Sequence, residues 1–172
     1  MSAQSKVHDK FPDKETFFTE CAQTKEDNWE GDMKWAADKL WMGSTNNWAG
    51  VVAHWNLVLD QTYGPHHGGC DTCRGTFRMD TSDNHKIIFY ETILGIGHYG
   101  KYINPEVGAT RVKVTKQGNE CVSATAWKNN DDDGRLMVMV NNFCDSTEDV
   151  AIQRGNEYVT AEVEAGIATF LW

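Results

Sequence analysis

The sequence predicts an α/β segment over residues 1–105, followed by an all-β segment over residues 106–172. Residues 1–105 show strand, helix, buried strand, loop and helix patterns in that order. After Pro105 the apolar residues recur with a period of two, which is typical of strands with one buried face. The first pattern is typical of an α/β barrel, and the second of a β-sandwich or a small barrel.

The first strand and helix follow from local patterns. A β-type run at residues 16–19 follows a turn at residues 11–14 and ends at Glu20. A helix is expected over residues 31–46, with Asp32 as its N-cap, because five apolar residues recur at helical spacing. These residues are Met33, Ala36, Ala37, Leu40 and Trp41.

The next segments complete the first half. Residues 48–59 are nearly all apolar and partly β-branched, which predicts one strand buried on both sides. The glycine-rich residues 60–75 predict a loop, and residues 75–80 a short strand. Apolar residues recurring along residues 84–102 predict a second helix.

Alternating residues predict the strands of the second half. We expect them around 112–114, 122–127, 136–141, 150–154, 158–164 and 166–172. Residues 129–134 contain an Asp-Gly step and predict a hairpin turn.

Composition excludes some classes of function. A formal net charge of −9 disfavours nucleic acid as a partner, and no apolar run approaches the roughly 20 residues of a membrane span. The first ten residues lack the apolar core of a signal peptide. Seven tryptophans are compatible with carbohydrate binding by ring stacking, or with a tryptophan-rich core.

Five cysteines leave at least one without an intramolecular partner, and weakly indicate an oxidising compartment. Cys70 and Cys73 form a C-x-x-C beside His66 and His67, which raises the alternative of a zinc site. Structural zinc sites usually draw their ligands from two separated pairs, so a local disulfide or free thiols are favoured.

Glu20 is the first candidate for chemistry. It ends one predicted strand, and the loop that begins near Trp55 follows another. Because the C-terminal ends of barrel strands open onto one face, both positions are expected at the same face. The alternative for Glu20 is a solvated glutamate at a strand end, and the alternative for Trp55 is a tryptophan of the core.

Several motifs, in order, resemble glycoside hydrolase family 30. Residues 11–21 (Phe-Pro-Asp-Lys, then Phe-Phe-Thr-Glu-Cys) resemble its nucleophile-bearing strand. Residues 54–60 (His-Trp-Asn-Leu-Val-Leu-Asp), with Gly64 and Pro65, resemble its eighth barrel strand and loop. Residues 68–75 are similar to the loop of the glucosylceramidase and β-1,6-glucanase-like members. Further similarities lie at residue 90, residues 97–102, 108–112 and 168–172.

The resemblance implies the last two β/α units of an incomplete (β/α)₈ TIM barrel (residues 1–105), followed by a β-sandwich (residues 106–172). It implies a secreted retaining β-glycosidase that hydrolyses β-glucosidic bonds in β-1,6-glucan or glucosylceramide-type substrates, without a cofactor. Glu20 matches the nucleophile. The expected substrate-binding residues are Trp55 and Asn56. Trp55 matches the tryptophan lining the sugar pocket, and Asn56 holds the strand end through its amide, more as structure than as chemistry. His54 departs from the acidic residue found in some relatives.

The family's acid/base glutamate and early strands have no counterpart in this sequence. The chain is therefore expected to be inactive alone and to need the missing N-terminal barrel half as a partner. We also expect unusual exposure within one apolar set: Met33, Trp35, Val51, Val52 and Val58. Two alternatives are a non-catalytic carbohydrate-binding or structural β-module, and a metal protein at Cys70 and Cys73.

Overall fold

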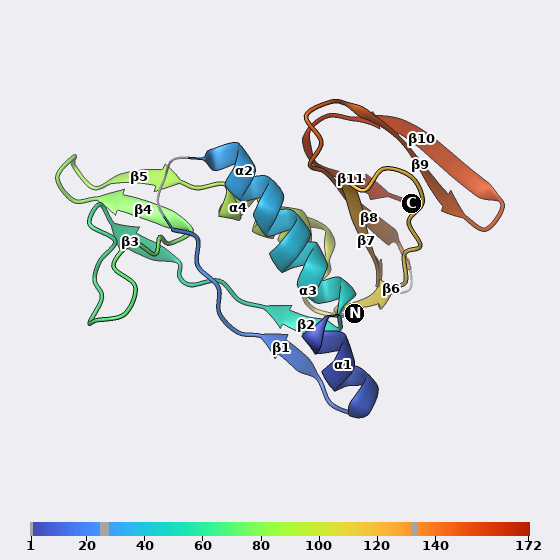
Figure 1. The fold of residues 1–172 in the computed structure, drawn as a ribbon, viewed down its shortest axis with the longest axis horizontal. Coiled ribbons are helices and arrows are strands. Elements are labelled where there is room, and N and C mark those ends of the chain that lie inside the picture. Colours follow the sequence, from blue (N-terminus) through green and yellow to red (C-terminus); the bar gives the residue numbers. More distant parts are fainter. Residues whose placement is uncertain (1, 25–27, 132–133) are drawn as a thin grey trace. The chain divides into compact units, whose positions relative to one another are not determined.

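The computed structural model describes residues 2–24, 28–131 and 134–172. The chain divides into two compact units, Met1–Gly97 and His98–Trp172, and each is described by itself (Figure 1). Along the described part of the chain, every helix is too short or too polar to cross a membrane.

Helices and short strands alternate in the first unit. They are α1 (Ala3–Lys10), β1 (Thr16–Phe18), α2 (Trp29–Trp35), the π-helix η1 (Ala36–Met42), α3 (Gly43–Asn46), β2 (Ala49–Val52), β3 (Val58–Asp60), β4 (Phe77–Asp80) and β5 (Lys86–Phe89). Helix α4 (Thr92–Tyr102) begins in the first unit and ends in the second. The second unit contains β6 (Ala109–Val112), β7 (Val122–Asn129), β8 (Leu136–Asn142), β9 (Glu148–Arg154), β10 (Glu157–Val163) and β11 (Gly166–Leu171).

Strands β1 and β2 form a parallel pair, and the helical segment α2–η1–α3 connects them (Figure 1). This is a βαβ arrangement, in which parallel strands are joined by a helical crossover. The five apolar residues predicted on one helix face are all buried, at 0–8% exposure. The predicted periodicity therefore identifies the face of the helix that packs into the core.

The predicted N-cap of this helix was wrong. The helix begins at Trp29, and Asn28 caps it by accepting a hydrogen bond from the Gly31 amide at 3.1 Å. Asp32 lies instead in the first turn, where a carboxylate is favourable to the helix dipole. It is available there to pair with Arg74.

The single buried strand predicted at residues 48–59 was also wrong. Residues 53–57 separate β2 from β3, and the two strands belong to different sheets. Gly50 and Val51 are exposed, and β2 pairs only with β1 within the described sheet. A run of apolar residues indicates burial on both sides only where both faces of the sheet are covered.

The apolar set expected to show unusual exposure does so in part. Trp35, Val51 and Val58 are 47%, 46% and 38% exposed, whereas Met33 is buried and Val52 is half-buried. Large apolar side chains therefore remain on the surface of the first unit.

Residues 84–102 are a strand followed by a helix, not the single helix predicted. Strand β4 pairs in parallel with β3 and antiparallel with β5. Asn84 and His85 both have positive φ, and the Lys86 amide donates to the Asp83 carbonyl at 2.9 Å. Such a turn matches the twist of a hairpin, so Ile87 and Ile88 continue as a strand.

In the second unit, four antiparallel strands form a sheet in the order β11-β8-β7-β6, and β9 and β10 form a separate hairpin. Buried side chains from β7, β8 and β10 make a shared core: Ala126, Val138, Val140 and Val163. Val150 and Ile152 of β9 pack against it. The predicted turn at residues 129–134 includes residues 132–133, which lie outside the described residues.

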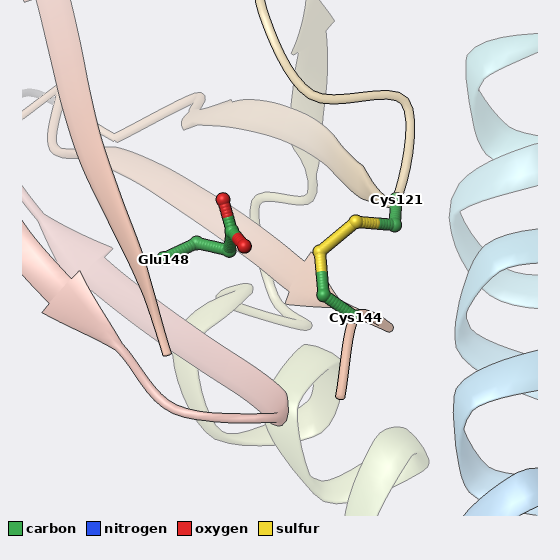
Figure 2. A group of neighbouring side chains, drawn as sticks. All are labelled: Cys121, Cys144 and Glu148. Carbon is green, nitrogen blue, oxygen red and sulfur yellow. A yellow bond between two sulfur atoms is a disulfide. The ribbon is translucent and has the colours of Figure 1, made fainter. Parts of the chain in front are cut away.

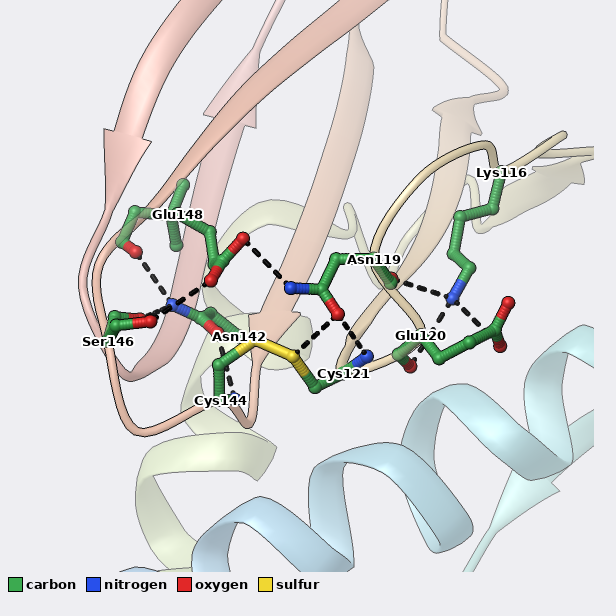
Figure 3. The surroundings of a disulfide bond; sticks show 9 residues. Lys116, Asn119, Glu120, Cys121, Asn142, Cys144, Ser146 and Glu148 are labelled. Atoms are coloured by element: carbon green, nitrogen blue, oxygen red, sulfur yellow. Dashed lines mark hydrogen bonds and ion pairs between the residues drawn. A yellow bond between two sulfur atoms is a disulfide. The ribbon is translucent and has the colours of Figure 1, made fainter.

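A disulfide joins Cys121, before β7, to Cys144, after β8, and the side chain of Glu148 lies beside it (Figure 2). The donor atoms of these three residues lie within 4.8 Å of one another. Because the two sulfur atoms are bonded to each other, neither is a thiolate that could ligate a metal. Asn119 bridges the group, since its Nδ2 donates to Glu148 and its Oδ1 accepts from the Cys121 amide (Figure 3).

Replacing both cysteines by serine is expected to destabilise the second unit by about 3 kcal/mol, because the bond closes a loop with a sequence separation of 23 residues. Denaturant unfolding of parent and Cys121→Ser/Cys144→Ser chains measures this loss. The matched pair Cys70→Ser/Cys73→Ser, which opens a loop with a separation of only three, is the control and loses less. Equal losses in the two pairs would contradict the loop-length argument.

Candidate active site

Three segments of the first unit lie side by side: two follow β1 and β2, and the third precedes β4. The Ala53 amide donates to the Phe18 carbonyl at 2.8 Å, and the Trp55 amide donates to the Cys21 carbonyl at 2.9 Å. The Thr76 amide then donates to the Asn56 carbonyl at 2.7 Å. The backbone ladder thus continues past β1 and β2, and it brings the segment after Glu20 against Trp55.

Glu20 and Trp55 line one cavity of about 300 Å³. The other lining residues are Ala22, Leu59, Tyr63, Pro65, His66, Gly68, Gly69, Cys70 and Cys73. Glu20 is exposed, and Trp55 is 43% exposed. Among the described residues that line the cavity, Glu20 supplies the only carboxylate. The arrangement places one carboxyl group beside a partly exposed indole.

A tight turn after β3 forms one wall of the cavity. The Asp60 carboxylate accepts hydrogen bonds from the Thr62 hydroxyl and from the Thr62 and Gly64 amides, at 2.7–2.9 Å. The Thr62 hydroxyl bond, followed by the amide bonds, holds the pKa of Asp60 below its ordinary value. The Asp60 amide donates back to the Gly64 carbonyl at 2.7 Å. The hydrogen bonds of Asp60 therefore stabilise the turn.

The disulfide Cys70–Cys73 closes the far part of the same loop. Of the two interpretations favoured for the C-x-x-C, a local disulfide or free thiols, the structure shows the disulfide. Cys73 also forms an isolated antiparallel β-bridge with Thr24, which connects the loop to the segment after Glu20. Cys21 is the free cysteine, and burial raises the pKa of its thiol.

A buried polar cluster lies beneath these segments. Arg74 donates to the side chains of Gln23, Asp32 and Glu91, and its guanidinium lies 4.7 Å from the Tyr90 ring centroid. Arg74 and Glu91 are almost fully buried. Burial raises the pKa of Glu91, and Arg74 acts in the opposite direction. The cluster joins the segment after Glu20 to α2, to the cavity loop and to the start of α4.

His54 is held by the helix. The buried Trp41 indole donates from Nε1 to His54 Nε2 at 2.6 Å, which makes this nitrogen an acceptor in a neutral imidazole. Burial lowers the pKa of His54. At the position where some relatives are expected to have an acidic residue, this chain thus has a neutral hydrogen-bond acceptor. Its bond with Trp41 anchors the chain just before Trp55.

The His54 contact predicts a pH dependence of stability. Because the folded pKa is lower than the ordinary value of 6.5, the folded state binds fewer protons, and stability is lost as pH falls below about 6.5 and through the folded pKa. His54→Asn keeps an acceptor but does not titrate, so its unfolding free energy is expected to fall less over this range.

Burial, and then Lys101, also lowers the pKa of His98, and this effect is the same in parent and variant. The difference between the two pH profiles therefore isolates the contribution of His54. Urea unfolding at a series of pH values measures it, with the exposed His67→Asn as control. Parallel pH profiles for parent and His54→Asn would contradict the expectation.

Asn56 lies beside the cavity wall. Its carbonyl accepts from Thr76, and a methyl group on Gly75 would come within 3.0 Å of its side-chain Oδ1. The peptide bond between Trp55 and Asn56 is cis. Asn56 is absent from the residues that line the cavity with Glu20 and Trp55. Asn56, expected to bind substrate, therefore lies outside the cavity lining, and its contact with Thr76 is made by the backbone carbonyl.

Comparison with known proteins finds relatives whose names describe glucanases. A scan against protein-family models finds no match. The chain is 30% identical over 142 residues to "Endo-1,6-beta-D-glucanase BGN16.3" of Trichoderma harzianum, covering 79% of this chain and 27% of that protein. It is 29% identical over 169 residues to "Endo-1,6-beta-D-glucanase neg1" of Aspergillus fumigatus, covering 94% and 30%.

Solved structures with a similar fold include a glucanase and a xylanase. "The endo-beta1,6-glucanase BT3312" superposes with a TM-score of 0.82 and 26% identity, over 96% of this chain and 37% of that one. The "Catalytic domain of GH30 xylanase C from Talaromyces cellulolyticus" shares the fold, with a TM-score of 0.67 and 15% identity over 91% and 40%. The resemblance to the C-terminal part of a glycoside hydrolase family 30 enzyme is therefore confirmed. The chain spans less than a third of the length of these curated relatives.

Proposed function

We propose that this chain is the nucleophile-bearing part of a retaining β-glycosidase that acts on β-1,6-glucan. The observation that carries the proposal is the cavity that unites Glu20 with Trp55. The relatives named as endo-1,6-β-glucanases favour β-1,6-glucan over a glucosylceramide-type substrate. In this proposal the indole of Trp55 stacks on the apolar face of the sugar, and Asn56 holds the strand end.

The proposed reaction is a double displacement. A Glu20 carboxylate oxygen attacks the anomeric carbon and the glycosidic oxygen leaves, protonated by a second carboxylic acid. Water, activated by that second group, then displaces Glu20 and releases the sugar. The two carboxyl groups of a retaining enzyme stand about 5–5.5 Å apart.

The acid/base is proposed to come from outside this chain. Glu20 is the only carboxylate among the described residues that line the cavity, and the chain spans less than a third of its curated relatives. We therefore propose that the chain alone hydrolyses no natural glycoside at a measurable rate. Robust turnover of β-1,6-glucan by the purified chain, abolished in Glu20→Ala, would contradict this.

We further propose that residues 1–105 are the last two β/α units of a (β/α)₈ barrel and residues 106–172 its β-sandwich. The βαβ arrangement of β1, α2–α3 and β2 supports the first part. The packing of the β9–β10 hairpin on the four-stranded sheet supports the second. A secreted location is compatible with the two disulfides.

Covalent trapping tests the role of Glu20. A 2-fluoro-β-glucoside with an activated leaving group needs no acid for its first step, so Glu20 is expected to become glycosylated even in this chain alone. Intact-mass and peptide mass spectrometry measure the adduct. Glu20→Gln is expected to abolish it, while the exposed control Glu15→Gln keeps it.

An adduct of equal yield in Glu20→Gln would sink the nucleophile assignment. A chain that binds β-1,6-linked gluco-oligosaccharides but is never labelled would instead support a non-catalytic carbohydrate-binding module.

A further inference from the structure

Tyr63 is an unusual residue in the wall of the cavity. Its backbone lies in the left-handed region, with φ of 62°, and the residue lines the cavity that Glu20 and Trp55 also line. Glycine adopts this conformation without penalty, whereas a residue with a side chain pays roughly 1–3 kcal/mol. Strained residues of this kind concentrate at ligand-binding sites.

The surrounding turn fixes Tyr63 in this conformation. The Tyr63 amide donates to the Asp60 carbonyl at 3.1 Å, and the Asp60 amide donates to the carbonyl of the next residue, Gly64. The Asp60 carboxylate holds the Thr62 and Gly64 amides on either side. The turn therefore fixes the direction in which the Tyr63 side chain leaves the backbone, and a glycine would satisfy the same backbone.

The side chain itself is suited to a sugar. Tyr63 is half-buried, so the residue keeps a solvent-accessible part. Within the described part of the chain, its hydroxyl has no recorded hydrogen-bond partner, which leaves both a donor and an acceptor for a ligand. An aromatic face and a hydroxyl together match the apolar face and the rim of hydroxyls of a pyranose.

We propose that Tyr63 is a sugar-binding residue, which gives the cavity a second aromatic surface besides Trp55 and a hydrogen bond to a sugar hydroxyl. The proposal rests on the proposed function, because it assigns the cavity to a β-glucosyl unit. It adds a residue that determines affinity for a sugar in this cavity. Tyr63 is singled out because it keeps a side chain in a backbone conformation that favours glycine.

The test is binding of β-1,6-linked glucobiose to the 172-residue chain, measured by calorimetry or by ligand-observed NMR. Tyr63→Phe removes only the hydroxyl and is expected to weaken binding about threefold to tenfold. Tyr63→Gly removes the ring, relieves the backbone strain and is expected to weaken binding more than Tyr63→Phe. Tyr63→Ala removes the ring but keeps the strain.

Two controls separate binding from folding. The melting temperature of Tyr63→Gly is expected to be at least that of Tyr63→Ala, because only glycine relieves the strain. Tyr158→Ala changes a tyrosine that is 73% exposed and absent from the cavity lining, and it is expected to bind as parent does.

The outcomes distinguish the two proposals. Weaker binding in Tyr63→Phe and Tyr63→Gly, with folding intact, supports the assignment. Parent-like binding in Tyr63→Gly together with lost binding in Trp55→Ala overturns the role of Tyr63 alone. No binding by the parent, and no trapping at Glu20, overturns the proposed function and this inference with it.

Discussion

Arg74→Met is expected to lower the free energy of unfolding of the first unit by about 3–5 kcal/mol, because it leaves a buried carboxylate without its partner. Glu91 is fully buried and Arg74 is 2% exposed, so water does not replace the lost contact. Domains of this kind are stable by roughly 5–15 kcal/mol in total. The substitution therefore removes a large share of the stability, and part of the population unfolds.

A double variant separates the effect of the charge from that of the packing. Arg74→Met/Glu91→Leu removes both charges, and it is expected to be more stable than Arg74→Met, since apolar replacement of a complete buried pair is often neutral. Lys86→Met breaks an exposed pair with Asp83 at 3.9 Å and is expected to change stability by less than about 0.5 kcal/mol. Chemical denaturation followed by circular dichroism measures all three.

The pH profile gives an independent check. Burial raises the pKa of Glu91 above its ordinary value of 4.5, and loss of Arg74 is expected to raise it further. A raised folded pKa favours the protonated carboxyl, so its contribution is present below pH 4.5 and is lost as pH rises. The penalty of Arg74→Met is therefore expected to shrink at acidic pH. A constant penalty at all pH values contradicts the account.

Local periodicity predicted the helical core but not the sheet edges. The buried face of α2–α3 followed from the spacing of Met33, Ala37 and Leu40, since a helix is defined by contacts within one segment. The break between β2 and β3 depends on which strands pair, and residues far apart in sequence decide that. The β5 strand was missed because Ile87 and Ile88 fit either pattern, and the positive φ of Asn84 and His85 decides between them.

The strand-end pattern and the family resemblance together predicted one part of the candidate site. Glu20 and Trp55 line one cavity, at the strand ends where both were expected. Arg74 and Glu91 were missed, because an isolated charge in a sequence gives no sign that it is buried with a distant partner. A signal for Tyr63 lay in the sequence, since a bulky residue precedes Gly64-Pro65 in a glycine-rich turn, but its φ comes only from the structure.

Gly95→Ala is the second substitution with a large expected effect. Gly95 of α4 lies so close to the Trp41 ring that an added Cβ would stand 1.8 Å from it. Trp41 is 3% exposed and donates to His54, so it has little room to move. Alanine favours a helix by about 1 kcal/mol, yet overpacking costs more, and a net loss of about 1–3 kcal/mol is expected.

Gly97→Ala is the matched control two residues along the same helix. Nothing lies within 4 Å of an added Cβ there, so a gain of up to about 1 kcal/mol is expected. Thermal and denaturant unfolding compare the two variants. Similar stabilities would contradict the packing argument, whereas tolerance of Gly95→Ala in a Trp41→Leu background would support it.

The same clash is expected to reach the cavity. Trp41 holds His54, and His54 precedes Trp55 in the chain, so a displaced indole moves the segment that places Trp55 beside Glu20. Binding of β-1,6-linked glucobiose is therefore expected to weaken in Gly95→Ala even where the chain is folded, and to stay unchanged in Gly97→Ala. Unchanged binding in a folded Gly95→Ala chain would show that the helix sets stability without setting the geometry of the site.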